Sequence, residues 1–270
     1  MLYFVATPIG NLDEITLRAL DVLKSVDIIA AEDTRRTAVL SDKYGITAKT
    51  VAYHKYNERK SVDGLIELLK SGKNIAVVSD AGMPTISDPG HILIDEAIAN
   101  GVDFTVVSGA CAAIDALVLS GLDTRRFTVL GFLPEKNVDR RRFVEPFVAS
   151  PSTLVFYSSV HDIKDDLKFL FGMLGARRCA VCREMTKMFE TVTRFTLGEE
   201  AEIVEKGEFV IVVEGASEQS ELNSLSPREH LEHYLAEGLD MREAVKRTAA
   251  DRHVPKNEIY KIAVEMKNDA

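Results

Sequence analysis

The chain has 270 residues, and its 33 basic and 42 acidic side chains give a net charge of −9 at pH 7. A content of 46% hydrophobic and 28% charged residues excludes disorder, collagen-like repeats and coiled coil for the whole chain, and the acidic balance argues against a protein that coats nucleic acid through a broad positive field. No apolar run reaches the ~18 residues of a membrane span and only three cysteines occur, so we expect a soluble, cytoplasmic protein of two domains with no membrane association.

In the first part of the chain, short β-rich runs alternate with amphipathic stretches, which is typical of βα units and a parallel sheet. The clearest helix is expected over residues 61–71, where Val62, Leu65, Ile66 and Leu69 repeat at helical spacing and Ser61 can cap the N-terminus. Strands are expected at residues 2–7, 27–31, 50–54, 74–79 and 103–107. These elements predict an α/β domain over residues 1–122.

A second α/β domain is predicted over residues 123–218, beginning with an apolar run near residues 126–130. Its further strands are expected at residues 153–158, 179–185, 190–196 and 208–213, and its helices around 139–149, 162–174 and 199–206. The closely spaced strands at 179–185 and 190–196 leave no room for a crossover helix, so we expect a mixed sheet.

The end of the chain, residues 219–270, is predicted to be a linker followed by a small helical extension. The linker is the polar stretch 216–224, and three short helices follow. Ser226 and Asp240 fit the N-cap pattern, and Pro255 suits a first helical turn.

Glycine spacing excludes the common α/β chemistries. No two glycines are two or four positions apart, so the G-x-G dinucleotide fingerprint and the G-x-S-x-G nucleophile elbow are absent. The only Gly-Lys pair, Gly72-Lys73, has Glu67 where a Walker A loop needs its first glycine. The chain is therefore predicted to be an α/β protein with an atypical set of loops.

Metal and thiol chemistry have weak support in the sequence. Cys179 and Cys182 have C-x-x-C spacing, but within a strand this spacing puts the two sulfurs on opposite faces, so we interpret them as buried small residues. His230 and His233 are interpreted as surface histidines. No metal site is expected.

Ligands of open parallel sheets gather at the carboxyl ends of the strands, and three loops there are unusual. Segment 7–12 (Thr-Pro-Ile-Gly-Asn-Leu) is a stiff turn, and segment 31–36 (Ala-Glu-Asp-Thr-Arg-Arg) crowds acids and bases at a strand end. Segment 79–90 contains two prolines, two glycines and two aspartates in twelve residues. Because βα connections usually have about 2 to 6 residues, this loop is predicted to bind a ligand.

At these loops the sequence resembles the ribosomal RNA small-subunit methyltransferase I family, within the tetrapyrrole methylase superfamily. The resemblance rests on segments 7–12, 15–20 (Ile-Thr-Leu-Arg-Ala-Leu), 32–35 and 79–90, and on later motifs at 131–134 (Gly-Phe-Leu-Pro), 183–187 (Arg-Glu-Met-Thr-Lys) and 207–210 (Gly-Glu-Phe-Val). It covers residues 2–215, and the tail resembles the helical extension of many members. The chain departs from the family at segment 107–112 (Val-Ser-Gly-Ala-Cys-Ala), where members usually have a Pro-Gly-Pro-Ser-Ala-like turn.

The resemblance implies two α/β domains with S-adenosylmethionine in the cleft between them, and a homodimer. It also implies methyl transfer to the ribose 2′-hydroxyl of a cytidine in the decoding region of 16S rRNA, in the small ribosomal subunit. A donor without phosphates needs no glycine-rich anion cradle, which agrees with the missing glycine motifs.

The donor is predicted to lie against residues at or just beyond the strand ends that face one cleft. These residues are Pro8, Ile9, Gly10, Asp80, Ala81, Gly82, Pro84, Ser108, Ala110, Phe156, Tyr157, Met185, Gly207 and Glu208.

Four residues are candidates for the chemistry at the substrate hydroxyl. Glu32 or Asp33 can accept its proton or a hydrogen bond, and Arg35 can hold the adjacent phosphate with two parallel hydrogen bonds. Lys187 is an alternative base if desolvation and nearby cations lower its pKa. We favour Asp33 and Arg35, with an N-cap role for Asp33 or Thr34 as the structural alternative.

Two other functions remain open. Related enzymes methylate tetrapyrroles or other small molecules, whereas a non-catalytic RNA-binding module would use the tail and leave the stiff loops unexplained. The tail is expected to dock ribosomal RNA through one face that carries Arg242, Lys246, Arg247, Arg252 and Lys256.

Overall fold

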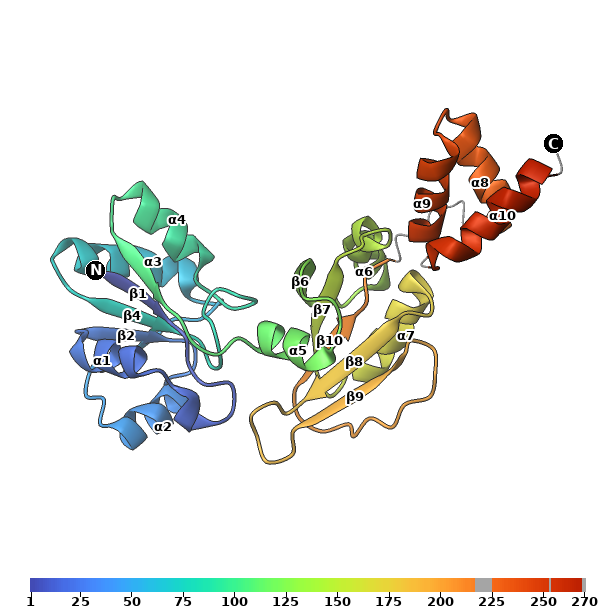
Figure 1. Ribbon diagram of the computed structural model, residues 1–270. Helices are drawn as coiled ribbons and strands as arrows, with labels where there is room; N and C mark the ends of the chain where they lie inside the picture. Colours follow the sequence, from blue (N-terminus) through green and yellow to red (C-terminus); the bar gives the residue numbers. More distant parts are fainter. Residues whose placement is uncertain (217–224, 253, 269–270) are drawn as a thin grey trace. The chain divides into compact units, whose positions relative to one another are not determined.

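The computed structural model describes residues 1–216, 225–252 and 254–268. The chain divides into two compact units, one made of residues 1–148 and 152–214 and the other of residues 149–151 and the described part of 215–270 (Figure 1). The predicted domain boundaries at residues 122 and 218 stay a prediction. Among the helices in these described ranges, none is long and apolar enough to cross a membrane.

The first half of the larger unit is a parallel sheet of five strands in the order β3-β2-β4-β1-β5. Every strand overlaps a predicted one. The elements in chain order are β1 (Leu2–Val5), η1 (Leu12–Glu14), α1 (Leu17–Ser25), β2 (Ile28–Ala31), α2 (Thr34–Tyr44), β3 (Lys49–Ala52), α3 (Glu58–Lys70), β4 (Ile75–Val78), α4 (His91–Ala99) and β5 (Phe104–Val107).

Helices cover both faces of this sheet, which explains why its central strands are continuous apolar runs rather than alternating ones. Strand β4, for example, is buried at all four positions. One core joins the sheet to α3 and α4, and a second core joins the other face to α1 and α2 (Figure 1).

The second half of the larger unit is the predicted mixed sheet, with strands in the order β6-β7-β10-β8-β9. Strands β6 and β7 are parallel and the other neighbours are antiparallel. The elements are α5 (Ala112–Ser120), β6 (Phe127–Phe132), α6 (Asn137–Val144), η2 (Glu145–Phe147), β7 (Thr153–Ser158), α7 (Ile163–Leu174), β8 (Arg178–Arg183), β9 (Thr191–Thr196) and β10 (Phe209–Val213). The predicted fold class, two α/β sheets with a helical end, is confirmed.

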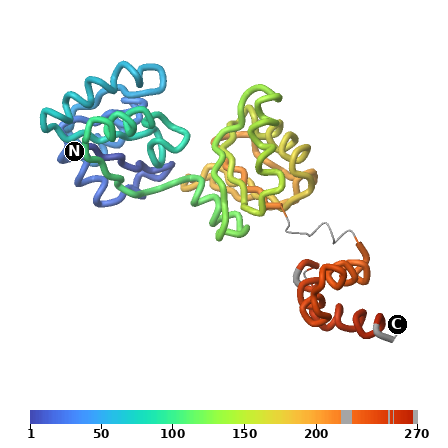
Figure 2. Tube along the Cα trace, turned by 90° about the horizontal axis from the view of Figure 1, so that it is seen from above, coloured from blue at the N-terminus to red at the C-terminus, as the bar shows by residue number. Residues whose placement is uncertain are grey.

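Helix α5 follows the last strand of the first sheet, yet it packs on the second sheet. The chain passes between the two sheets through the segment that joins β5 to α5 (Figure 2). Ala113, Ala116 and Leu117 lie in one core cluster with Val210 of β10 and Cys182 of β8. The opposite face of this sheet packs on α6 and α7 in a separate cluster that contains Cys179, so the two thiols lie on opposite faces as predicted.

Two local expectations for the larger unit were wrong. Residues 199–206 form no helix, because Ala201, Ile203 and Val204 are too few apolar residues to bury a helical face among four glutamates. Helix α3 begins at Glu58 and not at Ser61, since Asn57 ends the preceding loop by accepting a hydrogen bond from the His54 N–H (2.8 Å).

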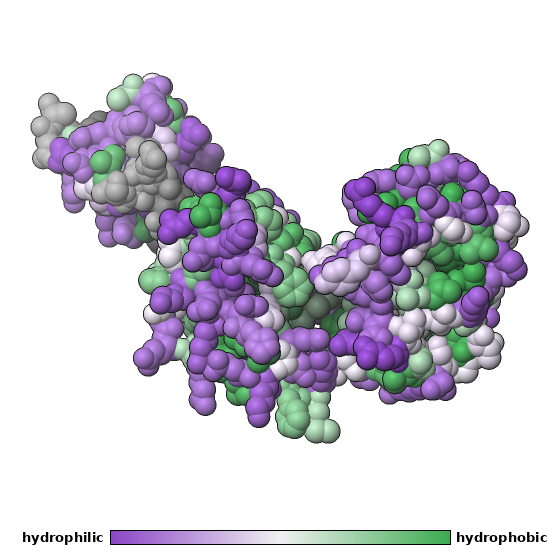
Figure 3. Space-filling view, turned by 180° about the vertical axis from the view of Figure 1, so that it is seen from behind, coloured by the Kyte–Doolittle hydropathy of each residue, from purple (hydrophilic) through white to green (hydrophobic). Residues whose placement is uncertain are grey.

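The smaller unit consists of α8 (Pro227–Ala236), α9 (Met241–Asp251) and α10 (Lys256–Asn268) around its own core, which includes Leu231, Ala244 and Ile259. Ser226 and Glu229 form the predicted capping box, and the predicted linker lies mostly outside the described residues. His230 is fully buried, so its interpretation as a surface histidine was wrong. The face of this unit seen in Figure 3 is mostly hydrophilic, as expected of helices that bury one side.

Candidate functional site

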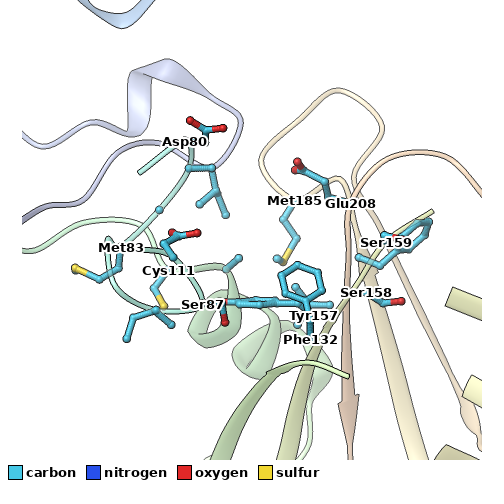
Figure 4. A pocket seen from close by; sticks show the side chains of 18 of the residues that line it. Asp80, Met83, Ser87, Cys111, Phe132, Tyr157, Ser158, Ser159, Met185 and Glu208 are labelled. Carbon is cyan, nitrogen blue, oxygen red and sulfur yellow. The ribbon is translucent and has the colours of Figure 1, made fainter. Parts of the chain in front are cut away.

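A cavity of about 440 Å³ lies between loops of the first sheet and strand ends of the second (Figure 4). Drug-sized ligands occupy cavities of about 300–1,000 Å³. Its lining residues are Ile9, Glu32, Arg36, Asp80, Ala81, Gly82, Met83, Ile86, Ser87, Asp88, Cys111, Ala112, Phe132, Tyr157, Ser158, Ser159, Val160, Met185, Gly207, Glu208, Phe209 and Val210.

The long loop after β4 forms one wall, and backbone hydrogen bonds fix its shape. The Gly82 N–H donates to Thr7 C=O and the Thr7 N–H donates to Gly82 C=O, at 3.0 and 2.9 Å. Gly82 has φ +79°, and a Cβ there would lie 3.2 Å from Ile9 Cγ2. Thr85 and Ser87 also have positive φ, 73° and 67°, although both carry side chains. The loop is therefore held in a strained shape, as is common at ligand sites.

The turn between β8 and β9 forms the opposite wall and contains two more strained residues, Glu184 (φ 50°) and Thr186 (φ 66°). Lys187 Nζ donates to Glu184 and Glu208, each at 2.9 Å. Gly207 has φ +92°, and an added Cβ there would lie 2.3 Å from Glu184 Oε1, so a side chain at this position would be strained and would displace Glu184.

Contacts between loops of the two sheets hold these walls together. The Asn11 N–H donates to Thr186 Oγ1 at 3.0 Å, and a Cβ on Gly10 would lie 2.6 Å from Lys187 Cγ. Strand β6 bulges at Gly131, where a Cβ would lie 2.7 Å from Ser87 Oγ. Gly10 and Gly131 thus let a side chain from one sheet's half of the unit pack against the backbone of the other half.

The floor of the cavity is apolar and aromatic. The rings of Phe132 and Tyr157 lie 5.4 Å apart, and the side chain of Met185 points toward them (Figure 4). Burial raises the pKa of Tyr157 to about 12, so its hydroxyl stays neutral at physiological pH. Such a floor suits a flat, uncharged ring of a ligand.

Acidic side chains give the cavity its charge. Four of its described lining residues are acidic, Glu32, Asp80, Asp88 and Glu208, and one, Arg36, is basic. Burial and the neighbouring Glu32 raise the pKa of Asp88 to about 6. Burial and Asp80 likewise raise the pKa of Glu32. The cavity thus favours a cationic ligand over a phosphate.

A second cavity of about 370 Å³ adjoins segment 31–36 and shares Glu32 with the first. It is lined by Glu32, Asp33, Thr34, Arg35, Ala52, His54, Lys55 and Tyr56. Asp33 is the N-cap of α2, where its carboxylate accepts from the Arg35 N–H at 2.9 Å and from the Arg35 side chain at 2.6 Å. The hydrogen bond from the Arg35 side chain lowers the pKa of Asp33 to about 2.

The structure brings eight of the fourteen predicted donor residues together around the first cavity. These are Ile9, Asp80, Ala81, Gly82, Tyr157, Met185, Gly207 and Glu208. Six others do not line it, namely Pro8, Gly10, Pro84, Ser108, Ala110 and Phe156. Gly10 is covered by Lys187, and Phe156 lies in the core on the opposite face of β7 because neighbouring strand residues alternate.

Of the four candidates for substrate chemistry, Glu32 lines both cavities and Asp33 and Arg35 line the second. Lys187 lines neither. Burial acts to lower the pKa of Lys187, but hydrogen bonds to Glu184 and Glu208 outweigh it and raise the pKa. The lowered pKa on which its role as a base depended is therefore contradicted.

Sequence reasoning missed several lining residues. Met83, Ile86, Ser87 and Asp88 belong to the loop that it singled out, and Phe132 belongs to the 131–134 motif. Ser158 is the last residue of β7, and Ser159 and Val160 follow it, so the rule that ligands bind at strand ends could have found all three. Arg36 belongs to segment 31–36, and Phe209 and Val210 belong to the 207–210 motif. In the part of the chain that the structure describes, no three His, Cys, Asp or Glu residues are grouped to hold a metal ion.

Residues 1–201 match the sequence profile of the family described as Tetrapyrrole (Corrin/Porphyrin) Methylases. The chain is 46% identical over 270 residues to the ribosomal RNA small subunit methyltransferase I of Halalkalibacterium halodurans, covering 97% of this chain and 93% of that protein. The protein of the same name from Bacillus subtilis is 43% identical over 272 residues, with 96% and 92% covered.

Two solved structures share the fold of the larger unit. A crystal structure of diphthine synthase aligns with a TM-score of 0.62 at 15% identity, covering 80% of this chain and 90% of that one. The methyltransferase CobJ aligns with a TM-score of 0.61 at 17% identity, covering 80% and 94%.

Proposed function

Because the chain belongs to the ribosomal RNA small subunit methyltransferase I family of the tetrapyrrole methylases, we propose that it transfers a methyl group from S-adenosylmethionine to ribosomal RNA of the small subunit. The acceptor that we propose is the ribose 2′-hydroxyl of a cytidine in the decoding region of 16S rRNA. Since the ribosome is the substrate, we also propose that the protein acts in the cytoplasm, as a homodimer.

The observation that carries the proposal is the first cavity, whose shape and charge fit the donor. When bound, S-adenosylmethionine supplies a methyl group on a positively charged sulfur. The apolar floor of Phe132 and Tyr157 suits its adenine, and the carboxylates of Asp80 and Asp88 suit its cationic groups. Arg36, the single basic residue among the described lining, already lies 3.5 Å from Asp80, which leaves a net negative site.

The residues of the chain must orient the acceptor hydroxyl and take its proton. A ribose hydroxyl has a pKa far above 7, so a carboxylate beside it aids transfer. Glu32 lines both cavities and its raised pKa makes it a better proton acceptor than Asp33, whose pKa is about 2. We therefore assign proton acceptance to Glu32 and the holding of the substrate phosphate to Arg35, whose guanidinium Asp33 positions at 2.6 Å. Alignment of the acceptor oxygen with the methyl carbon and sulfur of the donor supplies the rest of the rate enhancement.

The test uses the full chain, isotope-labelled donor and small subunits purified from cells that lack this methylation. Mass mapping of the RNA fragments identifies the labelled nucleotide and distinguishes a ribose from a base product. Label on one decoding-region cytidine ribose is the expected result. Label on a base, or no label with correctly folded subunits, would overturn the proposal.

A further inference from the structure

The second cavity has an aromatic and basic wall that the proposed function does not yet use. Tyr56 projects from the loop between β3 and α3 and is 83% exposed, although tyrosine is a residue that proteins mostly cover. Lys55 Nζ lies 5.1 Å from the centre of the Tyr56 ring, and the His54 ring lies 6.0 Å from it. One exposed ring therefore stands beside two basic side chains.

The loop that carries these side chains is held in place. Asn57 accepts a hydrogen bond from the His54 N–H at 2.8 Å and donates one to Ala52 C=O at 3.0 Å. The buried Tyr53 donates to Glu58 at 3.0 Å. Glu58 also accepts from the Gly90 N–H at 2.9 Å, which ties this loop to the one that lines the first cavity.

Polar groups of this cavity are placed for a ligand. His54 Nδ1 is buried and has no hydrogen-bond partner among the described residues. The side chain of Arg35 is 89% exposed at the same cavity. Because Glu32 lines both cavities, a group bound in the second cavity can present an atom at the edge of the first.

An unpaired nucleotide of RNA has the chemistry that matches this surface. Its base stacks on an aromatic ring, and its phosphate attracts lysine and arginine. A protein peptide would need an apolar groove or a free strand edge. The described lining of this cavity is mostly polar or charged, and the edge strand β3 reaches it only with its last residue, Ala52.

We propose that the second cavity holds the nucleotide to be methylated, with its base stacked on Tyr56 and its flanking phosphate beside Lys55 and Arg35. This assignment rests on the proposed function, because it takes RNA as the substrate. It places the ribose at Glu32, between the two cavities.

The first experiment uses the absence of tryptophan from the chain. Tyr56→Trp introduces a single tryptophan, whose emission, excited at wavelengths that tyrosine does not absorb, a stacked base should quench when unmethylated small subunits are added. Phe171→Trp, on the partly exposed face of α7 outside both cavities, is the matched control. Quenching at position 56 but not at position 171 supports the proposal. Unchanged fluorescence at position 56, with subunits shown to bind, overturns it.

The second experiment measures methyl transfer by the full chain at varied subunit concentration. Tyr56→Ala should raise KM for small subunits by roughly 5- to 150-fold, the range for loss of one stacked base, while Tyr56→Phe restores most of the loss. Donor affinity, measured by calorimetry, should stay within about twofold of the wild type in both variants, since Tyr56 does not line the first cavity. Equal KM in Tyr56→Ala and the wild type would overturn the assignment.

A third measurement concerns the phosphate. Lys55→Ala should reduce by about one the slope of log affinity against log salt concentration. Lys49→Ala, at the start of β3 and so at the end of that strand away from Lys55, should leave that slope unchanged. If the wild type does not methylate small subunits, the proposed function fails together with this inference. If it does, and neither Tyr56 nor Lys55 affects RNA binding, only the inference fails.

Discussion

Glu32 and Asp33 are neighbours in the sequence with opposite surroundings. Burial and Asp80 raise the pKa of Glu32, whereas a hydrogen bond from the Arg35 side chain holds the pKa of Asp33 at about 2. One peptide bond thus separates a carboxylate suited to accept a proton from one suited to stay ionised and hold a cation.

We therefore expect Glu32→Gln to lower the single-turnover rate of methylation by about 10²- to 10⁴-fold, the usual range for loss of a general base. Asp33→Asn should lower it much less, since asparagine also caps a helix. Rapid-quench assays with labelled donor measure both rates, and calorimetry checks that each variant binds the donor. A larger loss in Asp33→Asn than in Glu32→Gln would return the proton-accepting role to Asp33.

The donor cavity should be sensitive to a side chain at Gly82. Gly82→Val adds a branched group at φ +79° against Ile9 and into the lining, so donor affinity should fall by about tenfold or more, which corresponds to about 1.4 kcal/mol of lost contact. Gly45→Val is the control for backbone strain, because Gly45 has φ +65° but nothing within 4 Å of its Cβ position. Calorimetry and thermal unfolding compare the two. Wild-type affinity in Gly82→Val would remove this loop from the donor site.

Asp88 should make stability depend on pH. In the folded chain burial and Glu32 raise its pKa to about 6, while the ordinary value is 3.8, so the folded state retains a proton that the unfolded state releases. Stability from this group is therefore lost as the pH rises from about 4 to about 6.

Asp88→Asn removes the titrating carboxyl group, and with it the loss of stability between about pH 4 and pH 6. We expect the variant to have a higher melting temperature than the wild type at about pH 8 and nearly the same one at about pH 4. Asp63→Asn, an exposed position on α3, serves as the control and should show no such pH dependence. A constant difference between Asp88→Asn and the wild type at both pH values would contradict the prediction.

At the scale of elements, one buried ion pair connects the fold of the second sheet to the cavity. Arg140 on α6 lies 3.2 Å from Asp166 on α7, and the Ser158 hydroxyl donates to Asp166 at 2.7 Å at the end of β7. Ser158 lines the cavity. Asp166, which does not line the cavity, thus fixes the end of strand β7 that forms part of the cavity wall.

Asp166→Ala should destabilise the chain by about 3–5 kcal/mol, because it leaves the Arg140 guanidinium buried without its partner. The double variant Arg140→Met with Asp166→Leu should recover much of that loss, since matched apolar side chains avoid the desolvation penalty. Asp165→Ala, at the exposed neighbouring position, is the control. Urea unfolding measures all three, and equal stability of Asp166→Ala and Asp165→Ala would show that the pair contributes nothing.

The elements also show what sequence reasoning can reach. Both walls of the first cavity, including Gly82 and Met185, could be predicted from the sequence. The prediction used the apolar strand runs, the stiff loops and the rule that parallel strands end at one edge of a sheet. The rule does not tell which face a strand residue takes, so Phe156 was included with Tyr157 although it lies in the opposite core. Nor does it show that α5 leaves the first sheet to pack on the second, because that depends on tertiary contacts.

At the scale of the whole molecule, the two units have separate hydrophobic cores. The helical unit buries Leu231, Ala244 and Ile259 among its own helices, and its charge is nearly balanced, with seven basic and six acidic residues over residues 240–270. Arg252 belongs to the predicted RNA-binding face, but it donates to Leu225 C=O at 2.9 Å within this unit. Its side chain therefore helps to hold the unit together. Arg242, Lys246 and Lys256 are exposed.

A chain that ends at residue 216 should therefore fold and bind the donor with unchanged affinity, while its affinity for small subunits falls and depends less steeply on salt. Calorimetry and subunit binding at several salt concentrations test both halves of this prediction. Loss of donor binding in the shortened chain would instead assign the helical unit a structural role in the larger one.

The strained residues around the cavity have a consequence for directed evolution of the protein. Thr85, Ser87, Glu184 and Thr186 hold backbone conformations that glycine adopts more easily, and all four lie in the two loops that form the walls. A selection for heat resistance alone would favour glycine there, since relief of strain raises stability. The same exchange lets the walls move in the absence of ligand, so the variants it enriches would trade turnover for thermal tolerance.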